Sequence, residues 1–426
     1  MSLASTTSPC RRRTTALTHR LRDLGLIALA LFLGACSQDV KDEPKWYRGN
    51  LHTHSLWSDG DDLPEMIVDW YRESGYDFIA LSDHNTLAEG EAWTQPGSLA
   101  PGAFDRYVRR FGEDWVEYRI ESGDTLVRLK TLEEFRPVLE EAGRFLIIQA
   151  EEITDRFESA PVHVNATNLA EFIAPQGGTS VRDVMQRNVD AVLEQRRVTG
   201  QPMFPHINHP NFGWAVTAED IAALEGERFF EVYNGHPAVN NDGDSTRIGT
   251  ERMWDVILTD RLRHGREVIY GLAIDDAHHY HGWARNLANP GRGWIQVRAR
   301  RLSADSLIAA MERGDFYAST GVRLDDVRVT REGIEIDIDA EEGVSYRTEF
   351  VGTRLTGEHI GSADADSTSE AGPVVGEVLA MAAGPSPVYT FTGDELYVRA
   401  RIVSSKIKAN GTHDGERERA WTQPIL

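Results

Sequence analysis

The chain has 426 residues, a hydrophobic fraction of 41% and a formal net charge of -22, which is ordinary for a globular protein of two or three domains. So acidic a chain excludes binding to the nucleic-acid backbone, because that function needs clustered Lys and Arg. A small phosphate ester stays acceptable as a substrate, since bound metal ions can reverse the local electric field.

Residues 1–35 have the pattern of an export signal. Five arginines at positions 11–22 precede an apolar stretch, residues 24–33, that is too short to span a bilayer as a stable helix. The following Leu33-Gly34-Ala35-Cys36 resembles the lipobox of bacterial lipoproteins, which implies acylation of Cys36. We therefore expect an exported protein on the periplasmic side of a bacterial membrane, attached only through this lipid. An ordinary signal peptide is the alternative.

Only Cys10 and Cys36 are cysteines. Cys10 lies in the signal segment and Cys36 would carry the lipid, so no thiolate remains for a disulfide or a metal ion. Any metal site in the mature chain must therefore use His, Asp and Glu.

After a polar tether at residues 36–45, strands and helices alternate along residues 46–328. Residues 88–130 interrupt this alternation, and we expect them to be an insertion that carries a lid or a substrate wall. Alternating strands and helices favour a parallel sheet, and so many pairs favour a barrel. The expected strands are 47–52, 78–81, 145–150, 162–167, 203–207, 228–233, 267–274 and 293–297, and the expected helices are 62–75, 131–142, 180–197, 217–225, 247–263 and 303–313.

The pattern changes after about residue 328. Ile334, Ile336 and Ile338 alternate with acidic residues, and residues 396–402 alternate in the same way. A period of two with one polar face predicts antiparallel strands. We therefore expect a small C-terminal β-sandwich domain over residues 329–426.

Histidines and carboxylates gather where the expected strands end, and barrel enzymes build their active sites at such ends. Residues two apart on a strand share a face, so that His52 and His54 can hold one ion together. So many imidazoles and carboxylates in one place would be costly without cations, and these ligands suit zinc, manganese or iron. The five groups are His52, His54 and Asp59; Asp83 and His84; Glu151, Glu152 and His163; His206 and His209; and Asp275, Asp276, His278 and His279.

The order of these motifs, HTHSLWSDG, SDHN, a Glu after a strand, NHP and DDAH, resembles the PHP (polymerase and histidinol phosphatase) superfamily of metal-dependent hydrolases from Trp46 to Thr320. The segments AIDDAHHY and GDFYASTG resemble its carbaryl-hydrolase-like branch. The resemblance implies an α/β fold with a distorted (β/α)7 barrel and nine ligands around two or three divalent ions.

The resemblance also implies a grouping of the ligands. Glu151 stays an alternative to Glu152, and His206 stays an alternative to His209. Asp275 and His279 are the sequence neighbours of Asp276 and His278 in the last motif. The implied groups are His52, His54, Glu152 and Asp276 on one ion; Glu152, His163 and His209 on a second; and Asp59, His84 and His278 on a third.

Two cations a few ångströms apart make a hydroxide available from a bridging water and polarise the bond that it attacks. We therefore expect a phosphoesterase for small phosphate esters. The alternatives are hydrolysis of a carbamate, ester or amide bond and, in another class, a non-catalytic lipoprotein that binds a glycan or polymer.

Several residues are expected to act on the substrate. Asp276 or His278, beside the ions, would move the proton towards the leaving group. Arg285 and Arg292 lie in the loop after the last ligands, and the segment 234–236 follows a strand. These arginines and Asn234 or His236 are candidate substrate contacts, with an exposed loop position as the alternative for each.

Overall fold

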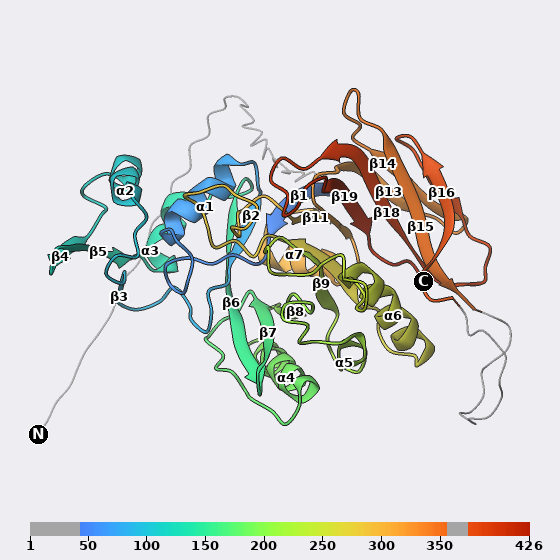
Figure 1. Ribbon diagram of the computed structural model, residues 1–426, viewed down its shortest axis with the longest axis horizontal. Helices are drawn as coiled ribbons and strands as arrows, with labels where there is room; N and C mark the ends of the chain where they lie inside the picture. Colours follow the sequence, from blue (N-terminus) through green and yellow to red (C-terminus); the bar gives the residue numbers. More distant parts are fainter. Residues whose placement is uncertain (1–42, 356–373) are drawn as a thin grey trace, which may run out of the picture. The chain divides into compact units, whose positions relative to one another are not determined.

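The computed structural model describes residues 43–355 and 374–426. The signal segment and Cys36 lie outside these ranges. Within them, no helix combines the length and the apolar character needed to cross a membrane. The main feature is a 13-stranded sheet with the order β10-β9-β8-β7-β6-β2-β1-β11-β12-β19-β18-β15-β16 (Figure 1).

The expected strands and helices are present, most of them within about three residues of their predicted bounds, but the strand expected at 145–150 continues to Phe157 and pairs antiparallel with β7. The strands that carry the candidate site are β1 (Lys45–Asn50), β2 (Phe78–Leu81), β6 (Leu146–Phe157), β7 (Ala160–Thr167), β8 (Phe204–Ile207), β9 (Phe229–Asn234), β10 (Tyr270–Ile274), β11 (Trp294–Ala299) and β12 (Phe316–Ser319). The helices between them are α1 (Pro64–Glu73), α3 (Leu132–Leu139), α4 (Val181–Thr199), α5 (Ala218–Ala222), α6 (Thr250–Arg263) and α7 (Ala304–Met311).

The sheet does not close into the expected (β/α)7 barrel, although the α/β class is confirmed. β1 pairs with β2 and with antiparallel β11, so β10 has no second strand partner in the described chain. The carboxylate of Asp275 accepts hydrogen bonds from the backbone N–H groups of Gly291, Arg292 and Gly293. These bonds fix the loop so that the next strand, β11, lies beside β1. Beyond the strands, Thr53 and Ala277 form a single parallel bridge.

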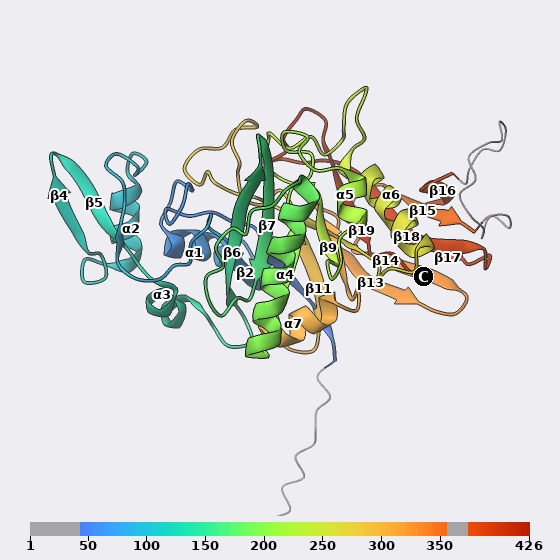
Figure 2. The same cartoon turned by 90° about the horizontal axis from the view of Figure 1, so that it is seen from below.

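The helices cover the sheet through apolar side chains. α4 begins after Ser180, whose hydroxyl accepts the backbone N–H of Asp183, and it ends at Gly200 in the left-handed conformation. It packs against β7 and β8 (Figure 2), and Val184 and Val189 are fully buried there. Burial of such a side chain stabilises the fold by about 1.5–3 kcal/mol, so the carboxyl ends of the strands are held on a rigid support.

The insertion forms a small lobe at one end of the molecule (Figure 1). Its strands form a three-stranded sheet, β3-β5-β4, and its helix buries Tyr107 against Leu63 and Val127 beside α1. A separate lobe between β2 and α3 agrees with the predicted insertion, while its role as a lid or substrate wall stays a prediction. The elements are β3 (Ala92–Trp93), α2 (Ala103–Phe111), β4 (Tyr118–Glu121) and β5 (Asp124–Leu129).

The C-terminal strands are antiparallel, as expected. The sheet β13-β14-β17 shares one hydrophobic core with the strands β15, β18 and β19, through residues such as Ile336, Phe350 and Ala400. β19 also pairs with β12, so one of the two layers continues the main sheet. These strands are β13 (Leu324–Val329), β14 (Gly333–Ile338), β15 (Tyr346–Arg354), β16 (Glu377–Ala383), β17 (Val388–Thr390), β18 (Glu395–Ile407) and β19 (Arg417–Thr422).

The fold buries a carboxyl group that has no ion pair among the described residues. Its titration makes the free energy of unfolding depend on pH. Glu227, just before β9, is fully buried, and its Oε1 accepts the backbone N–H groups of Arg228 and Phe229. Burial raises the pKa of Glu227 to about 8, so the folded protein holds a proton that the unfolded chain releases above its ordinary pKa of 4.5. This contribution to stability is complete below pH 4.5 and is lost as the pH rises towards 8.

Replacing Glu227 with Gln, which is uncharged at every pH, should therefore stabilise the protein selectively at high pH. We expect a free energy of unfolding higher than that of the unmodified protein by roughly 3 kcal/mol at pH 8.5 and little different at pH 4.5. Urea unfolding followed by circular dichroism at the two pH values measures the difference. An equal difference at both pH values would contradict the assignment.

Candidate metal centre

The nine predicted ligands lie in one cluster, two of them (Glu152 and His163) within the strands β6 and β7 and the others in the segments between elements. Each is within 4 Å of at least one other member through a nitrogen or carboxylate oxygen. They are His52, His54, Asp59, His84, Glu152, His163, His209, Asp276 and His278.

Glu152 occupies the middle of the cluster and is completely buried. Its Oε1 lies 2.8 Å from Nδ1 of His163 and 3.4 Å from Nε2 of His209. Its Oε2 lies 3.4 Å from Nε2 of both His52 and His54. Each oxygen therefore faces a different set of imidazoles, which is the arrangement expected of a carboxylate that bridges two ions.

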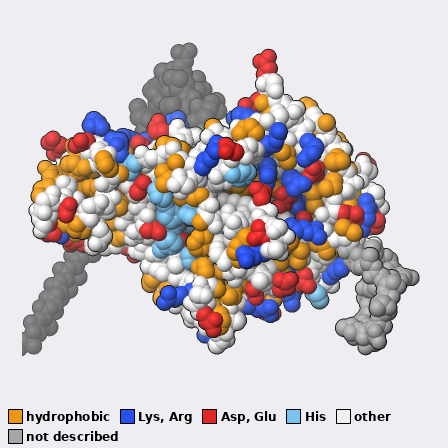
Figure 3. Space-filling view, in the orientation of Figure 1, with side chains coloured by type: hydrophobic (Ala, Val, Ile, Leu, Met, Phe, Trp, Pro, Cys, Tyr) orange, Lys and Arg blue, Asp and Glu red, His pale blue; other side chains and the backbone are white. Residues whose placement is uncertain are grey.

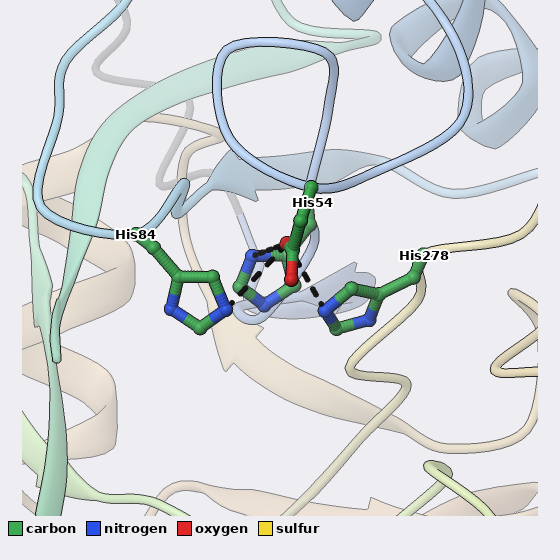
Figure 4. Close-up of side chains that lie close together, drawn as sticks. His54, His84 and His278 are labelled. Carbon is green, nitrogen blue, oxygen red and sulfur yellow. Dashed lines mark ion pairs between the residues drawn. The ribbon is translucent and has the colours of Figure 1, made fainter. Parts of the chain in front are cut away.

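Asp59 forms the centre of a second group at the exposed side of the cluster. Its Oδ1 lies 3.3 Å from His278, 3.5 Å from His84 and 3.7 Å from His54. Figure 4 shows these three imidazoles turned towards one carboxylate. This group matches the predicted third ion, with His54 as an additional neighbour.

Local backbone geometry places these ligands. In the turn of residues 55–60, a Cβ at Gly60 would lie 2.3 Å from the carbonyl oxygen of His54, so only glycine fits there. Asp83 accepts hydrogen bonds from the backbone N–H of Ser55 and the hydroxyl of Ser58, and this holds the turn to the end of β2. The Asp of the SDHN motif is therefore structural, and only its neighbour His84 enters the cluster.

The structure separates most of the alternatives that the sequence left open. The carboxylate of Glu151 accepts the backbone N–H of Ile173 and lies outside the cluster. Glu152 lies at the centre of the cluster. Asp275 is used to fix the loop that leads to β11. His279 accepts the backbone N–H of Ala288. His206 and His209 both approach the cluster, but only His209 faces Glu152.

Sequence reasoning missed Glu231, a fully buried carboxylate in the middle of β9. Its Oε1 lies 2.7 Å from Nδ1 of His52 and 3.3 Å from Nε2 of His206. Its Oε2 accepts the backbone N–H of His209 at 2.6 Å. The signal available in the sequence was one acid within the otherwise apolar run FFEVY. Glu231 holds the proton of His52 on Nδ1 and leaves Nε2 turned towards Glu152 and Asp276.

The predicted substrate contacts lie in the following surroundings. Asn234 is fully buried, and its amide donates to Glu231 at 2.9 Å and to Asp276 at 3.0 Å, so it positions these carboxylates. Arg285 is exposed and pairs with Asp414 at 2.5 Å. Arg292 is buried and donates to backbone carbonyls, including those of Gly235 and Leu287. These arginines serve the loops that follow the ligands.

The buried atoms fit divalent cations. Nε2 of His52 and Nδ1 of His54 are buried and form no hydrogen bond with the described residues. Burial and the nearby His278 lower the pKa of His54 to about 3, which keeps the imidazole neutral as a metal ligand requires. Burial opposes the charge of Glu231, yet His52 and His206 lower its pKa to about 2. The carboxylates are therefore ionised and attract positive charge into the cluster.

Several sets of these ligands have the spacing that one ion requires. The ligand atoms within each set lie within 4.8 Å of one another. The sets are His54, Asp59, His84 and His278; His52, His54 and Glu152; His52, His206 and Glu231; His52, His209 and Asp276; and His84, Glu152 and His163. Nitrogen and oxygen donors in this mixture suit zinc, manganese or iron.

Comparison with known proteins finds likeness in structure only. No family model and no curated protein matches the sequence. A two-domain protein from Bacteroides vulgatus that contains a predicted PHP-like metal-dependent phosphoesterase is 14% identical, with a TM-score of 0.41, over 90% of this chain and 96% of that one. An amidohydrolase from Chromobacterium violaceum, solved with sulfate and no metal, is 15% identical, with a TM-score of 0.27, over 55% and 88%. These TM-scores are low, so the functional argument rests on the site.

Proposed function

We propose that the chain is a metal-dependent hydrolase that cleaves small phosphate esters with two or three divalent ions. The observation that carries this proposal is the convergence of six histidines and two further carboxylates around Glu152, far apart in the chain and largely buried. Such a group is too costly to bury without a function that needs cations. The order of its motifs, which resembles that of the PHP superfamily, supports the same reaction class.

The protein groups supply position and the ions supply charge. Bound divalent cations offer Lewis acidity and a water of lowered pKa. Glu152 would hold two of them through its separate oxygens, and Asp59 would hold another with His84 and His278. Asn234 fixes Asp276, and Glu231 fixes His52, so the ligands are oriented before a substrate enters.

We assign to His236 a hydrogen bond to the leaving oxygen of the substrate in place of the predicted proton transfer, because burial lowers its pKa to about 4 and the ring is neutral at pH 7. The two residues predicted for proton transfer are already engaged, because Asp276 faces His54 and Asn234, and Nδ1 of His278 bonds the carbonyl of Asp276 while its Nε2 faces Asp59. Nδ1 of His236 accepts the backbone N–H of Ala238, which places the proton on Nε2. Its ring centroid lies 5.6 Å from that of His278, at the rim of the cluster.

Replacing His236 with Phe should lower kcat by about 10²–10³-fold while metal content stays unchanged, since the loss of one such hydrogen-bond donor costs about that much. Steady-state kinetics and elemental analysis of the same preparation measure both quantities. A smaller loss for a substrate with a more acidic leaving group would support the role. A loss of metal from the variant would contradict it.

The experiment that tests the proposed function is an activity screen of purified protein. The substrates are a phosphate monoester, a phosphodiester and an aryl carbamate, each with and without added Mn²⁺ or Zn²⁺. We expect metal-dependent release of product from a phosphate ester. Turnover of the carbamate alone would favour the alternative hydrolase, and glycan binding without turnover would favour the non-catalytic protein.

For the segment outside the described residues, we propose that Cys36 anchors the protein to the membrane by a lipid, as its lipobox-like context indicates. Replacing Cys36 with Ser should move the protein from the membrane fraction to the soluble fraction of the producing cells. Fractionation followed by immunoblotting measures this, and an unchanged distribution would overturn the proposal.

A further inference from the structure

An arginine-lined cavity of about 460 Å³ lies beside α6 and the C-terminal strands. Its volume falls in the range of small-molecule sites. The arginines come from four different elements, which meet only in the folded protein. They are Arg252 on α6, Arg347 on β15, Arg401 on β18, and Arg417 and Arg419 on β19.

Two of these arginines have no carboxylate partner among the described residues. Each carboxylate that lines the cavity has its own cation: Asp242 pairs with Arg419 at 3.1 Å, Glu251 with Arg401 at 3.1 Å, and Glu416 with Lys408 at 2.8 Å. Arg347 in turn pairs with Glu349.

Within residues 43–355 and 374–426, neither Arg252 nor Arg417 forms an ion pair. Arg417 donates to the backbone carbonyl of Ser405 at 3.1 Å, and Arg252 donates to the carbonyl of Val375. These bonds hold the side chains in place without cancelling their charge. On a chain with a net charge of -22, a cavity with surplus positive charge is an exception that indicates an anionic ligand.

The cavity adjoins a second one that reaches the residue after His236. This second cavity of about 220 Å³ shares Arg417, Arg419 and Asp242 with the first, and it extends to Pro237. Pro237 follows His236, whose ring packs against His278 of the cluster. Figure 3 shows histidines across the middle of this face and Lys and Arg gathered on its neighbouring part.

We propose that the substrate is elongated and carries a second anionic group, a phosphate, sulfate or carboxylate, that binds Arg252 and Arg417 while its ester end reaches the metal centre. This rests on the proposed function and specifies its substrate class. Guanidinium groups bind such oxyanions through two parallel hydrogen bonds. Binding energy from this distant group can orient the reacting end, so it acts on kcat as well as on KM.

The first experiment tests the anion site without the metal centre. Inorganic pyrophosphate is titrated by calorimetry into the chelator-treated His52→Ala, His54→Ala variant, which cannot hold phosphate through metal ions. We expect binding that weakens by about tenfold or more when Arg252 and Arg417 are both replaced with Gln. The matched control is Arg285→Gln, an exposed arginine outside the cavity. Equal binding by the double arginine variant and the control would overturn the anion site.

The second experiment tests whether the anion is part of the substrate. The metal-loaded protein is assayed with p-nitrophenyl phosphate, which has no second anionic group, and with alkanediol bisphosphates of increasing length. We expect the Arg252→Gln, Arg417→Gln variant to lose about tenfold in kcat/KM on the preferred bisphosphate and to keep its activity on p-nitrophenyl phosphate. Equal effects on both substrates would show that the anion is a separate ligand. If no phosphate ester is hydrolysed by any form, the proposed function fails, and the calorimetric result still decides whether the anion site exists.

Discussion

Replacing His52 and His54 together with Ala is expected to remove bound metal and to lower hydrolysis by about three orders of magnitude or more. Both imidazoles are fully buried and lie 3.4 Å from the same oxygen of Glu152. Without them, the carboxylates of Glu152 and Asp276 lose the neighbours that complete a coordination shell. Elemental analysis and steady-state kinetics on the same preparation measure the two losses.

The appropriate control is His264→Ala, because His264 is an exposed histidine that caps the C-terminus of α6 and is paired only with Asp260 in the described chain. We expect this variant to keep its metal and activity. Circular dichroism should show similar helix and strand content in all three proteins, since neither His52 nor His54 belongs to the hydrophobic core. Unchanged metal content in the double variant would overturn the assignment of the cluster.

Replacing Glu231 with Gln is expected to lower metal affinity by about 10–100-fold although Glu231 need not touch an ion. The carboxylate accepts a hydrogen bond from Nδ1 of His52 at 2.7 Å, and this bond makes Nε2 of the same ring more basic and fixes its direction. Gln keeps the shape but removes the charge. Competition with a chromophoric chelator measures the affinity, and Glu231→Asp should lie between Gln and the unmodified protein.

Glu151 offers a matched control for Glu231. It is equally buried and stands beside Glu152, yet it accepts only the backbone N–H of Ile173 among the described residues. Burial raises the pKa of Glu151 to about 7, so much of it is protonated at neutral pH and Gln changes little. Metal affinity should be unaffected in Glu151→Gln. Equal losses in the two variants would mean that general disturbance of the buried region, and not orientation of His52, explains the effect.

Much of the site could be predicted because parallel strands bring their carboxyl ends to one edge. His52, His84 and Asp276 each follow a strand, and the repetition of this pattern, together with the resemblance to the PHP superfamily, placed them together. Glu231 could not be predicted in the same way, because it belongs to none of the recognised motifs and its direction depends on which face of β9 turns towards His52. Local patterns cannot settle that question, since the strand is buried on both faces.

The open sheet and the roles of the loop residues were also beyond local reasoning. Closure between β1 and β10 was expected from the alternation of strands and helices, but β1 instead pairs with β11. That outcome depends on Asp275, whose carboxylate gathers three consecutive backbone N–H groups of a distant loop. The same loop turns Arg285 towards Asp414, a contact between residues far apart in the sequence.

The pairing of β12 with β19 has a consequence for how the protein is made. Tyr317 is opposite Thr422, and the amide of Gln423 bonds both backbone groups of Gly271 on β10. During translation, the strands that carry the ligands are therefore synthesised before β19, and the edge of β12 stays unpaired until β19 is made. Open edges invite pairing between chains. A chain truncated after the last metal ligand would thus aggregate, and it would not form an active protein.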